Sequence, residues 1–245
     1  MIKFFRKIRQ QLLSENKLSK YLIYAIGEIV LVVIGILIAL SINNSNEDRK
    51  LKTVEINILK GIKQNILMDT IDLNHNTRRH KEMNQRDSIL LLHIYDKKPL
   101  DSLIEEKLMD LKYSNISLML HSSYFNEVKS KGLSIISNKT LRDSIARLYE
   151  FKYAYLTLIE NESKQYDYLS LYEDLIVDYI YLDRELGSFK IGEKHFQSIL
   201  NDELFLTKLI NAYEKRGFLD ELYKTTNRSI LNILDQIDVE LATRR

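Results

Sequence analysis

The chain has 245 residues, with seven glycines, a single proline and no cysteine. Folds built from β-strands need more turn-forming residues than this, so the composition predicts a mainly helical protein. The lack of cysteine excludes disulfide bonds, cysteine-ligated metal centres and thiol nucleophiles. Residues 1–20 carry a net charge of +5, from six basic residues and one acidic residue, and the remainder carries −3. A basic start before a mildly acidic body does not indicate a partner nucleic acid.

Residues 1–20 place apolar side chains on one helical face and basic side chains around it. The basic ones are Lys3, Arg6, Lys7 and Arg9. This pattern predicts an amphipathic segment that lies on anionic membrane lipid. Docking to a cytoplasmic partner is the alternative interpretation. In both cases about twenty residues are too few to form a catalytic or signalling domain.

Residues 21–43, YLIYAIGEIVLVVIGILIALSIN, are long and apolar enough to form a transmembrane helix. A helix needs roughly 20 residues to cross a hydrocarbon core of about 30 Å. A core helix of a soluble protein is seldom apolar on every face, and a cleaved signal peptide has a shorter apolar region. We therefore expect an uncleaved signal anchor.

The charge around this segment predicts its direction. Basic residues are enriched on the cytoplasmic side of a span, so residues 1–20 are expected in the cytoplasm. Residues 44–245 would then lie outside the cytoplasm. In a bacterium this corresponds to the inner membrane, with a periplasmic domain.

The span contains one ionisable side chain, Glu28, about 10 Å from its cytoplasmic end at 1.5 Å per residue. Intramembrane carboxylates are costly and usually face protein. On a helix Glu28 shares a stripe with Tyr24, Gly35 and Ala39, and Gly35 and Ala39 are small residues spaced for close helix approach. We therefore predict a helix–helix contact. Glu28 would hydrogen-bond across an oligomer, pair with a basic group of another membrane protein, or carry a proton.

Helical periodicity continues through residues 45–97, with a break expected near Asn74-His75-Asn76. Pro99 ends this helix, because the residue before proline is disfavoured in helical conformation. The motif D-S-L-I-E resembles a capping box and predicts a short helix over residues 101–112.

A second short helix is expected over residues 122–131, ended by Gly132. Asn138 can cap the next helix, whose apolar seam includes Tyr155 and continues nearly to Asp183. Gly187 and Gly192 indicate a connecting loop.

Asn201 is expected to cap the last long helix. Its apolar seam follows Tyr223 and has a 4-3-4 spacing that requires another helix beside it: Ile230, Leu234, Ile237 and Leu241. The fold class is thus all-α: an amphipathic segment over residues 1–20, a transmembrane helix over residues 21–43, and an antiparallel bundle of long helices over residues 44–245.

No catalytic signature, phosphate loop or zinc helix is present in the sequence, and no cofactor is expected. His75 and His80 are five residues apart, which places them on different helical faces, and both are expected to be exposed. Eight of the 15 tyrosines lie between residues 149 and 181. Interhelical packing is the favoured interpretation. The alternative is an aromatic groove for a glycan or apolar peptide, lined by Tyr153, Tyr168 and Tyr181.

Residues 1–48 resemble the start of a domain-of-unknown-function family of single-span, N-in membrane proteins from Bacteroidota. The resemblance lies in the basic start, the GEIVLVVIGILIAL span and the asparagine-rich exit, although Ser45 stands where that family often has tryptophan. Residues 124–150 and the IDVEL motif at residues 237–241 are also similar. The resemblance implies an inner-membrane protein with a helical periplasmic domain, and it implies no activity.

Three functional hypotheses follow. The favoured one is a non-enzymatic scaffold or accessory subunit of a membrane complex, which contacts a second copy of the chain or another membrane protein through its span. The second is a periplasmic, sensor-like binding module that signals through a membrane partner. The third is an ion-coupled subunit that uses Glu28, by analogy with the layout of proton-driven stator complexes.

Overall fold

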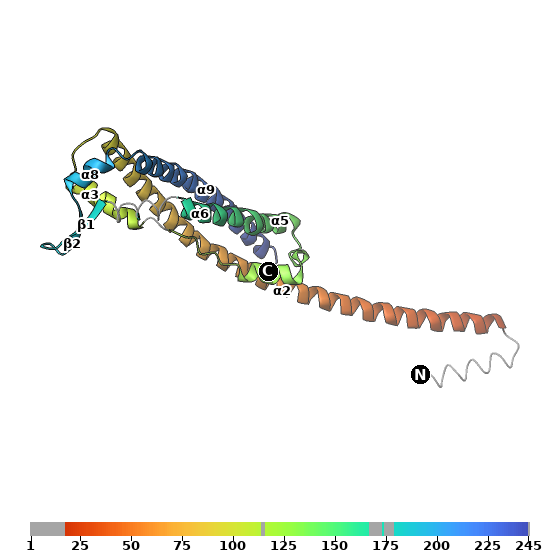
Figure 1. Ribbon diagram of the computed structural model, residues 1–245. Coiled ribbons are helices and arrows are strands. Elements are labelled where there is room, and N and C mark those ends of the chain that lie inside the picture. Colours follow the sequence, from red (N-terminus) through yellow and green to blue (C-terminus); the bar gives the residue numbers. More distant parts are fainter. Residues whose placement is uncertain (1–17, 114–115, 167–172, 174–178, 245) are drawn as a thin grey trace. The chain divides into compact units, whose positions relative to one another are not determined.

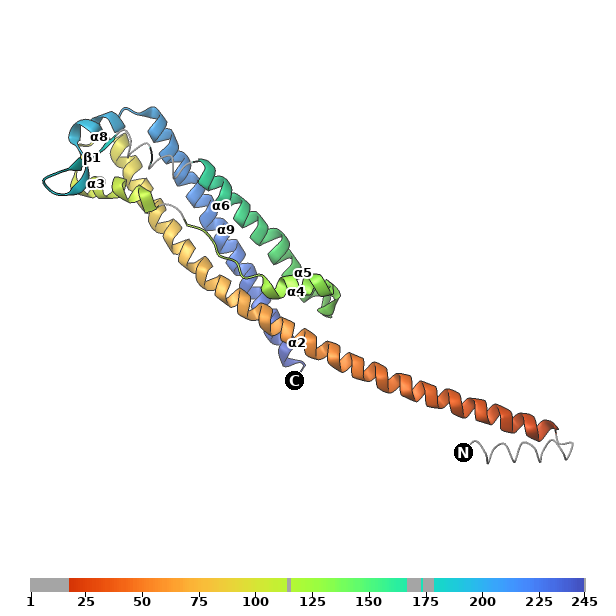
Figure 2. The same cartoon turned by 60° about the horizontal axis from the view of Figure 1, so that its bottom comes forward.

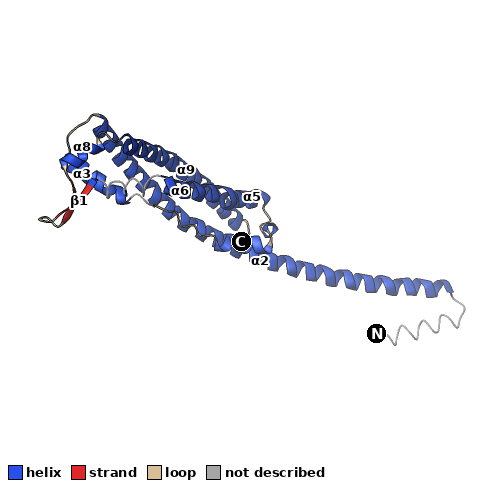
Figure 3. Ribbon diagram, viewed as in Figure 1, coloured by secondary structure: helices blue, strands red, loops and turns tan. Residues whose placement is uncertain are grey.

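The computed structural model describes residues 18–113, 116–166, 173 and 179–244. The basic segment with Lys3, Arg6, Lys7 and Arg9 lies outside these residues. The chain divides into two compact units, Met1–Ile56 and Asn57–Arg245. Among the described residues, helices dominate both units and one short hairpin is the exception (Figure 3), so the predicted all-α class is confirmed.

Helix α2 (Leu18–Tyr95) contributes to both units. The predicted break near residues 74–76 is wrong, since α2 remains helical there. Asparagine weakens a helix by competing for backbone hydrogen bonds, but here its side chain has tertiary partners. Asn76 Nδ2 donates to the Tyr223 hydroxyl at 3.3 Å, and Asn74 Oδ1 accepts from Asn227 at 2.9 Å.

Short elements follow α2, largely as predicted: α3 (Ser102–Met109), the 3₁₀ turn η1 (Asp110–Tyr113), α4 (Ser123–Lys131) and η2 (Leu133–Ile135). The Asp101 carboxylate caps α3 by accepting from the Ile104 amide at 2.8 Å. Gly132, at φ 97°, ends α4 in a conformation that residues with a Cβ rarely adopt.

The next long helix contains a π turn. α5 (Lys139–Arg147) is capped by Asn138 as predicted, continues as the π segment η3 (Leu148–Tyr153) and then as α6 (Ala154–Tyr166). A π turn accommodates one extra residue, so the buried seam moves by one position. Tyr153 is consequently buried and Tyr155 is 39% exposed, the reverse of the prediction.

Residues predicted as helix and loop near Asp183 and Gly187 form an antiparallel hairpin, β1 (Ile180–Asp183) and β2 (Ser188–Ile191), in which Ile180 pairs with Ile191. Gly187 adopts φ 62° in the turn. α8 (Glu193–Ile199) follows. Asp202, and not Asn201, caps α9 (Glu203–Ala242), since its carboxylate accepts from two helix amides at 3.0 Å each.

In the second unit α9 lies beside the C-terminal half of α2 and beside α5 and α6, and it runs antiparallel to them (Figures 1 and 2). At one end of this bundle α3, α8 and the hairpin close an apolar cluster around Leu90, Ile94 and Phe196. The contact between α4 and α2 is close: a Cβ on Gly61 would lie 2.3 Å from the Tyr124 ring.

Candidate functional site

The membrane-type segment of the first unit exposes its apolar side chains. The large ones from Leu22 to Ile42 are between 46% and 69% exposed. This is the one described helix long and apolar enough to cross a membrane, by length and composition.

The predicted contact stripe lies on this segment. Gly35 and Ala39 are exposed, Glu28 is half-buried, and a Cβ added to Gly35 would meet no atom within 4 Å. The side chain of Tyr24 is outside the described part of the chain. The small residues therefore leave room for a second helix, and the apolar surface around them needs lipid or protein to cover it.

The second unit has a different character, because its core contains many polar side chains. Those buried among its described residues are Asn65, Asp69, Asn76, His80, Arg86, Asp87, Glu160, Arg216 and Thr226. Several of them form two clusters with distinct chemistry.

The first cluster holds the extended segment of residues 116–121. Asp69 is fully buried, and it accepts from the His121 amide at 2.8 Å and from His121 Nδ1 at 2.9 Å. Glu160 accepts from the Leu118 amide at 3.2 Å, and Asp72 accepts from the Met119 amide at 2.7 Å. Backbone amides outside helices and sheets still need hydrogen-bond partners, and here carboxylates from α2 and α6 supply them.

Tyrosine hydroxyls complete this cluster. Tyr153 donates to Asp69 at 2.9 Å, and Tyr223 donates to Glu160. Burial raises the pKa of Asp69, and the hydrogen bonds from His121 and Tyr153 oppose this. Burial, reinforced by the charge of Asp69, also raises the pKa of Tyr153, so its hydroxyl remains a neutral donor.

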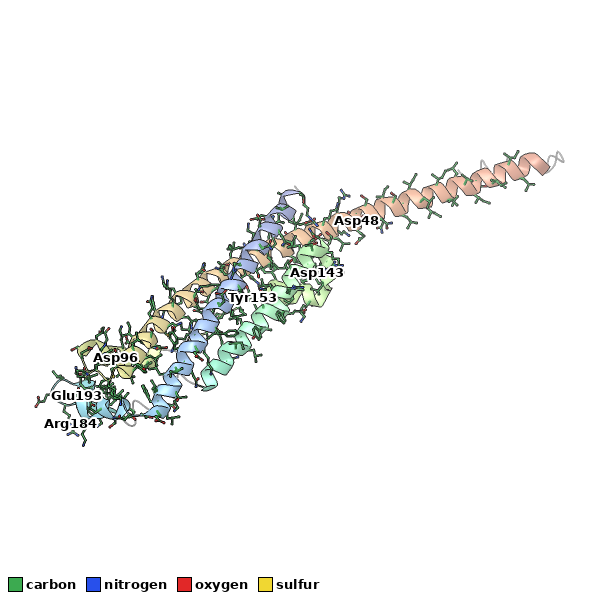
Figure 4. All side chains as sticks on the ribbon, turned by 90° about the horizontal axis from the view of Figure 1, so that it is seen from above. Asp48, Asp96, Asp143, Tyr153, Arg184 and Glu193 are labelled. Carbon is green, nitrogen blue, oxygen red and sulfur yellow. The ribbon has the colours of Figure 1, made fainter. Side chains whose placement is uncertain are left out.

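The outcome for the predicted tyrosine groove is divided. Tyr153 lies among the packed helices of the second unit (Figure 4) and is 2% exposed, so the favoured interpretation, interhelical packing, is confirmed for it and the alternative surface role is wrong. Tyr181 is 43% exposed on the hairpin. Tyr168 falls outside the described residues.

The second cluster joins α2 to α9 through one buried carboxylate. Asp87 Oδ1 accepts from Arg86 Nε at 2.9 Å and Nη2 at 2.7 Å, while Oδ2 accepts from Arg216 Nε at 2.6 Å. Asp87 and Arg216 are both 0% exposed. Arg86 Nη1 also donates to the Asp110 carbonyl at 2.8 Å, which fixes η1 against α2.

His80 lies between the two clusters. It is 3% exposed, so its predicted exposure is wrong, whereas His75 is exposed as predicted. Neither ring nitrogen of His80 has a hydrogen-bond partner among the described residues, and its ring centroid lies 5.3 Å from that of Tyr223. Burial lowers the pKa of His80 to about 4, with Arg216 adding to this and Asp220 opposing it. The imidazole is therefore neutral near pH 7.

The buried polar residues belong to a repeating pattern of positions that a search for apolar residues alone does not detect. Buried positions recur at alternating intervals of four and three along both helices. On α2 they are Ile62, Ile66, Asp69, Leu73, Asn76, His80, Met83, Asp87, Leu90 and Ile94. On α9 they are Phe205, Leu209, Ala212, Arg216, Leu219, Tyr223, Thr226, Ile230, Ile233 and Ile237. Both patterns are heptad seams with polar members.

The arrangement is that of an antiparallel bundle in which polar residues of the two seams face each other. Asp87 meets Arg216 and His80 meets Tyr223, as antiparallel seams require. In the described part of the chain no group of three or more histidine, aspartate or glutamate side chains could hold a metal ion. The chemistry that the two clusters show is hydrogen bonding and ion pairing between helices.

Comparison with known proteins gives one family. A model of a family of unknown function, DUF6090, matches residues 28–174, from Glu28 in the span to beyond the end of α6. No curated protein and no solved structure matches the chain.

Proposed function

The chain belongs to this family of unknown function, and from that premise we propose that it is a non-enzymatic, single-span membrane protein. In this proposal it acts as an oligomeric scaffold or as an accessory subunit of a membrane complex. The observation that carries the proposal is the exposed apolar surface of the segment from Leu22 to Ile42. Such a surface is stable in a bilayer and would drive aggregation in water.

A second copy of the chain is the partner that we propose for the span. Glu28, Gly35 and Ala39 recur within one helical stripe, so two identical helices can present the same stripe to each other. Small residues allow the backbones to approach, and a carboxyl group in hydrocarbon is stabilised when a neighbouring helix hydrogen-bonds it.

Disulfide cross-linking in native membranes tests this contact, because the chain has no cysteine of its own. Ala39→Cys should give a discrete dimer on oxidation. Ser41→Cys, about 200° around the helix, should not. In the Ala39→Cys background, Gly35→Leu should weaken the dimer, whereas the matched change Gly27→Leu on another face should leave it unchanged. Monomers throughout would overturn the proposed self-association.

Substitutions of Glu28 distinguish its possible roles. If Glu28 hydrogen-bonds across the dimer, Glu28→Gln should retain cross-linking through Ala39→Cys, because the glutamine amide can still hydrogen-bond. Glu28→Ala should reduce the cross-linking, because alanine cannot. If Glu28 carries a proton, Glu28→Gln should abolish the phenotype of the wild-type gene while the dimer persists. An unchanged phenotype in Glu28→Gln argues against ion coupling.

We further propose an inner-membrane location with a cytoplasmic N-terminus and a periplasmic helical domain. The +5 charge of residues 1–20 supports this direction. Single cysteines test it in intact spheroplasts with a membrane-impermeant maleimide. Ser102→Cys, which is exposed on α3, should react at once, and Gln10→Cys only after lysis. The reverse pattern would refute the proposed topology.

A further inference from the structure

A cavity of about 260 Å³ lies in the second unit between α2 and the segment formed by α3 and η1. Its lining residues are Arg79, Glu82, Met83, Arg86, Lys107 and Asp110. Arg79 and Glu82 border solvent, with side chains 38% and 51% exposed. Arg86 forms the inner wall and is 7% exposed. The cavity therefore connects the surface to a buried guanidinium group.

The lining has an excess of positive charge, with three cationic and two acidic side chains. The cations come from two elements, α2 and α3, so they converge on the cavity from different directions. Arg79 Nη1 lies 3.0 Å from Glu82 Oε2. An ion pair this exposed contributes little to stability, so Arg79 can exchange Glu82 for a ligand at low cost.

Arg86 is held in place without a ligand. Two of its nitrogens donate to Asp87, and Nη1 donates to the Asp110 carbonyl at 2.8 Å. The guanidinium plane is thus fixed at the cavity wall by contacts that tie α2 to η1. A positive charge fixed in this way needs no reordering when an oxyanion enters the cavity, which lowers the entropy cost of binding.

We propose that this cavity binds a small anionic molecule through a carboxylate or phosphate group, which Arg79 and Lys107 contact and which the fixed charge of Arg86 attracts. Arginine and lysine are the side chains that recognise these groups, through charge-assisted hydrogen bonds. Met83 supplies an apolar wall beside them. This inference stands apart from the proposed oligomerisation of the span, and it assigns a ligand site to the helical domain.

The size of the cavity limits the ligand. Sites for drug-sized molecules have volumes of about 300–1,000 Å³, and this cavity lies just below that range. An inorganic oxyanion or a compact dicarboxylate fits, whereas a nucleotide or a peptide is too large. Glu82 and Asp110 disfavour a ligand with more than one phosphate group, because like charges repel at short range.

Isothermal titration calorimetry of the full-length protein in detergent micelles tests the site, with inorganic phosphate and succinate as separate probes at constant ionic strength. One probe or both should bind saturably, and the stronger one identifies the preferred group. Arg79→Gln and Lys107→Gln should each weaken that binding by about tenfold or more, since each removes a charged donor. Both side chains are partly exposed, so both variants should retain the fold.

Lys81→Gln is the matched control, because Lys81 is exposed on α2 and does not line the cavity. It should bind the probe as the wild type does. Equal thermal stability of the four proteins without probe shows that lost binding is not lost folding. Two results would overturn the proposal: no saturable heat from either probe up to about 10 mM, or equal binding by all variants, which would indicate a general salt effect.

Discussion

Replacing Asp87 with alanine should sharply destabilise the helical domain. Asp87 is the carboxylate that Arg86 and Arg216 share, and Asp87 and Arg216 are both fully buried. Its removal leaves two guanidinium groups in the core without this partner. Breaking a buried ion pair from one side costs about 3–5 kcal/mol. For a domain of this size, each kcal/mol lowers the melting temperature by about 2–4 °C. We therefore expect Asp87→Ala to melt roughly 6–20 °C below wild type.

The assay is thermal unfolding of the full-length protein in detergent micelles, followed by far-ultraviolet circular dichroism. Asp143→Ala is the matched control, because the Asp143 side chain is 63% exposed and lies 3.9 Å from Arg142. A surface change of this kind should stay within about 0.5 kcal/mol of wild type. A loss below about 1 kcal/mol in Asp87→Ala would refute the assignment of Asp87 as the link between α2 and α9.

An apolar replacement of the whole cluster separates stability from specificity. The triple variant removes the three buried charges of this cluster through the changes Arg86→Met, Asp87→Leu and Arg216→Met. Such replacements are often neutral or stabilising by about 1–4 kcal/mol. If the polar pair sets the register of α2 and α9, the triple variant should keep its stability but lose a single well-defined packing. Broadened side-chain NMR signals would reveal that loss, and sharp wild-type-like signals would argue against a role in register.

Three further predictions follow from particular contacts. Burial holds the pKa of His80 near 4, below its usual 6.5, so the unfolded chain binds this proton more readily. Above pH 6.5, His80 is neutral in both states and does not lower the free energy of unfolding. As the pH falls from 6.5 to 4, protonation of His80 in the unfolded chain lowers that free energy by about 3 kcal/mol. His80→Phe should flatten this pH dependence in urea titrations, and an unchanged slope would contradict it. Tyr153→Phe removes a donor from buried Asp69 and should cost about 1–3 kcal/mol in the same titrations; an effect near zero would show that the bond is dispensable. Gly61→Ala should destabilise by about 1–3 kcal/mol because its Cβ meets an aromatic ring at 2.3 Å, whereas Gly217→Ala, whose nearest contact is 3.7 Å, should stabilise by about 0.5–1 kcal/mol. Equal melting temperatures for the two alanine variants would contradict the close approach.

Local signals predicted the short elements well. The Asp101 and Asn138 caps and the Gly132 stop depend on groups within a few residues of each other, so the sequence contains all of their determinants. Asn201 was the wrong cap by one residue, because the carboxylate of Asp202 reaches two helix amides. The predictions failed where distant residues decide the outcome. The one-residue shift at η3 and the burial of Tyr153 depend on packing against other helices.

The polar core was the larger omission. Asp69, His80 and Asp87 interrupt the apolar periodicity of α2. His80 was expected to be exposed, and Asp69 and Asp87 were not predicted as core positions. The partners of His80 and Asp87 on α9 lie well over a hundred residues away in the chain, as in the bond from Arg216 to Asp87, and those of Asp69 are His121 and Tyr153. A heptad count that tolerates polar members would have found these positions. The identity of each partner still requires knowledge of how the helices align.

The sequence by itself determined that the protein is helical, that it carries one apolar span with a carboxylate and small residues on one stripe, and where most short helices begin and end. These properties depend on composition, periodicity and neighbours in the chain. Only the tertiary structure decided that α9 pairs with α2 through buried charges, that carboxylates hold residues 116–121, and that Arg79, Arg86 and Lys107 converge on one cavity. The reason is physical: a buried charge is stable only beside a partner, and that partner is brought close by folding.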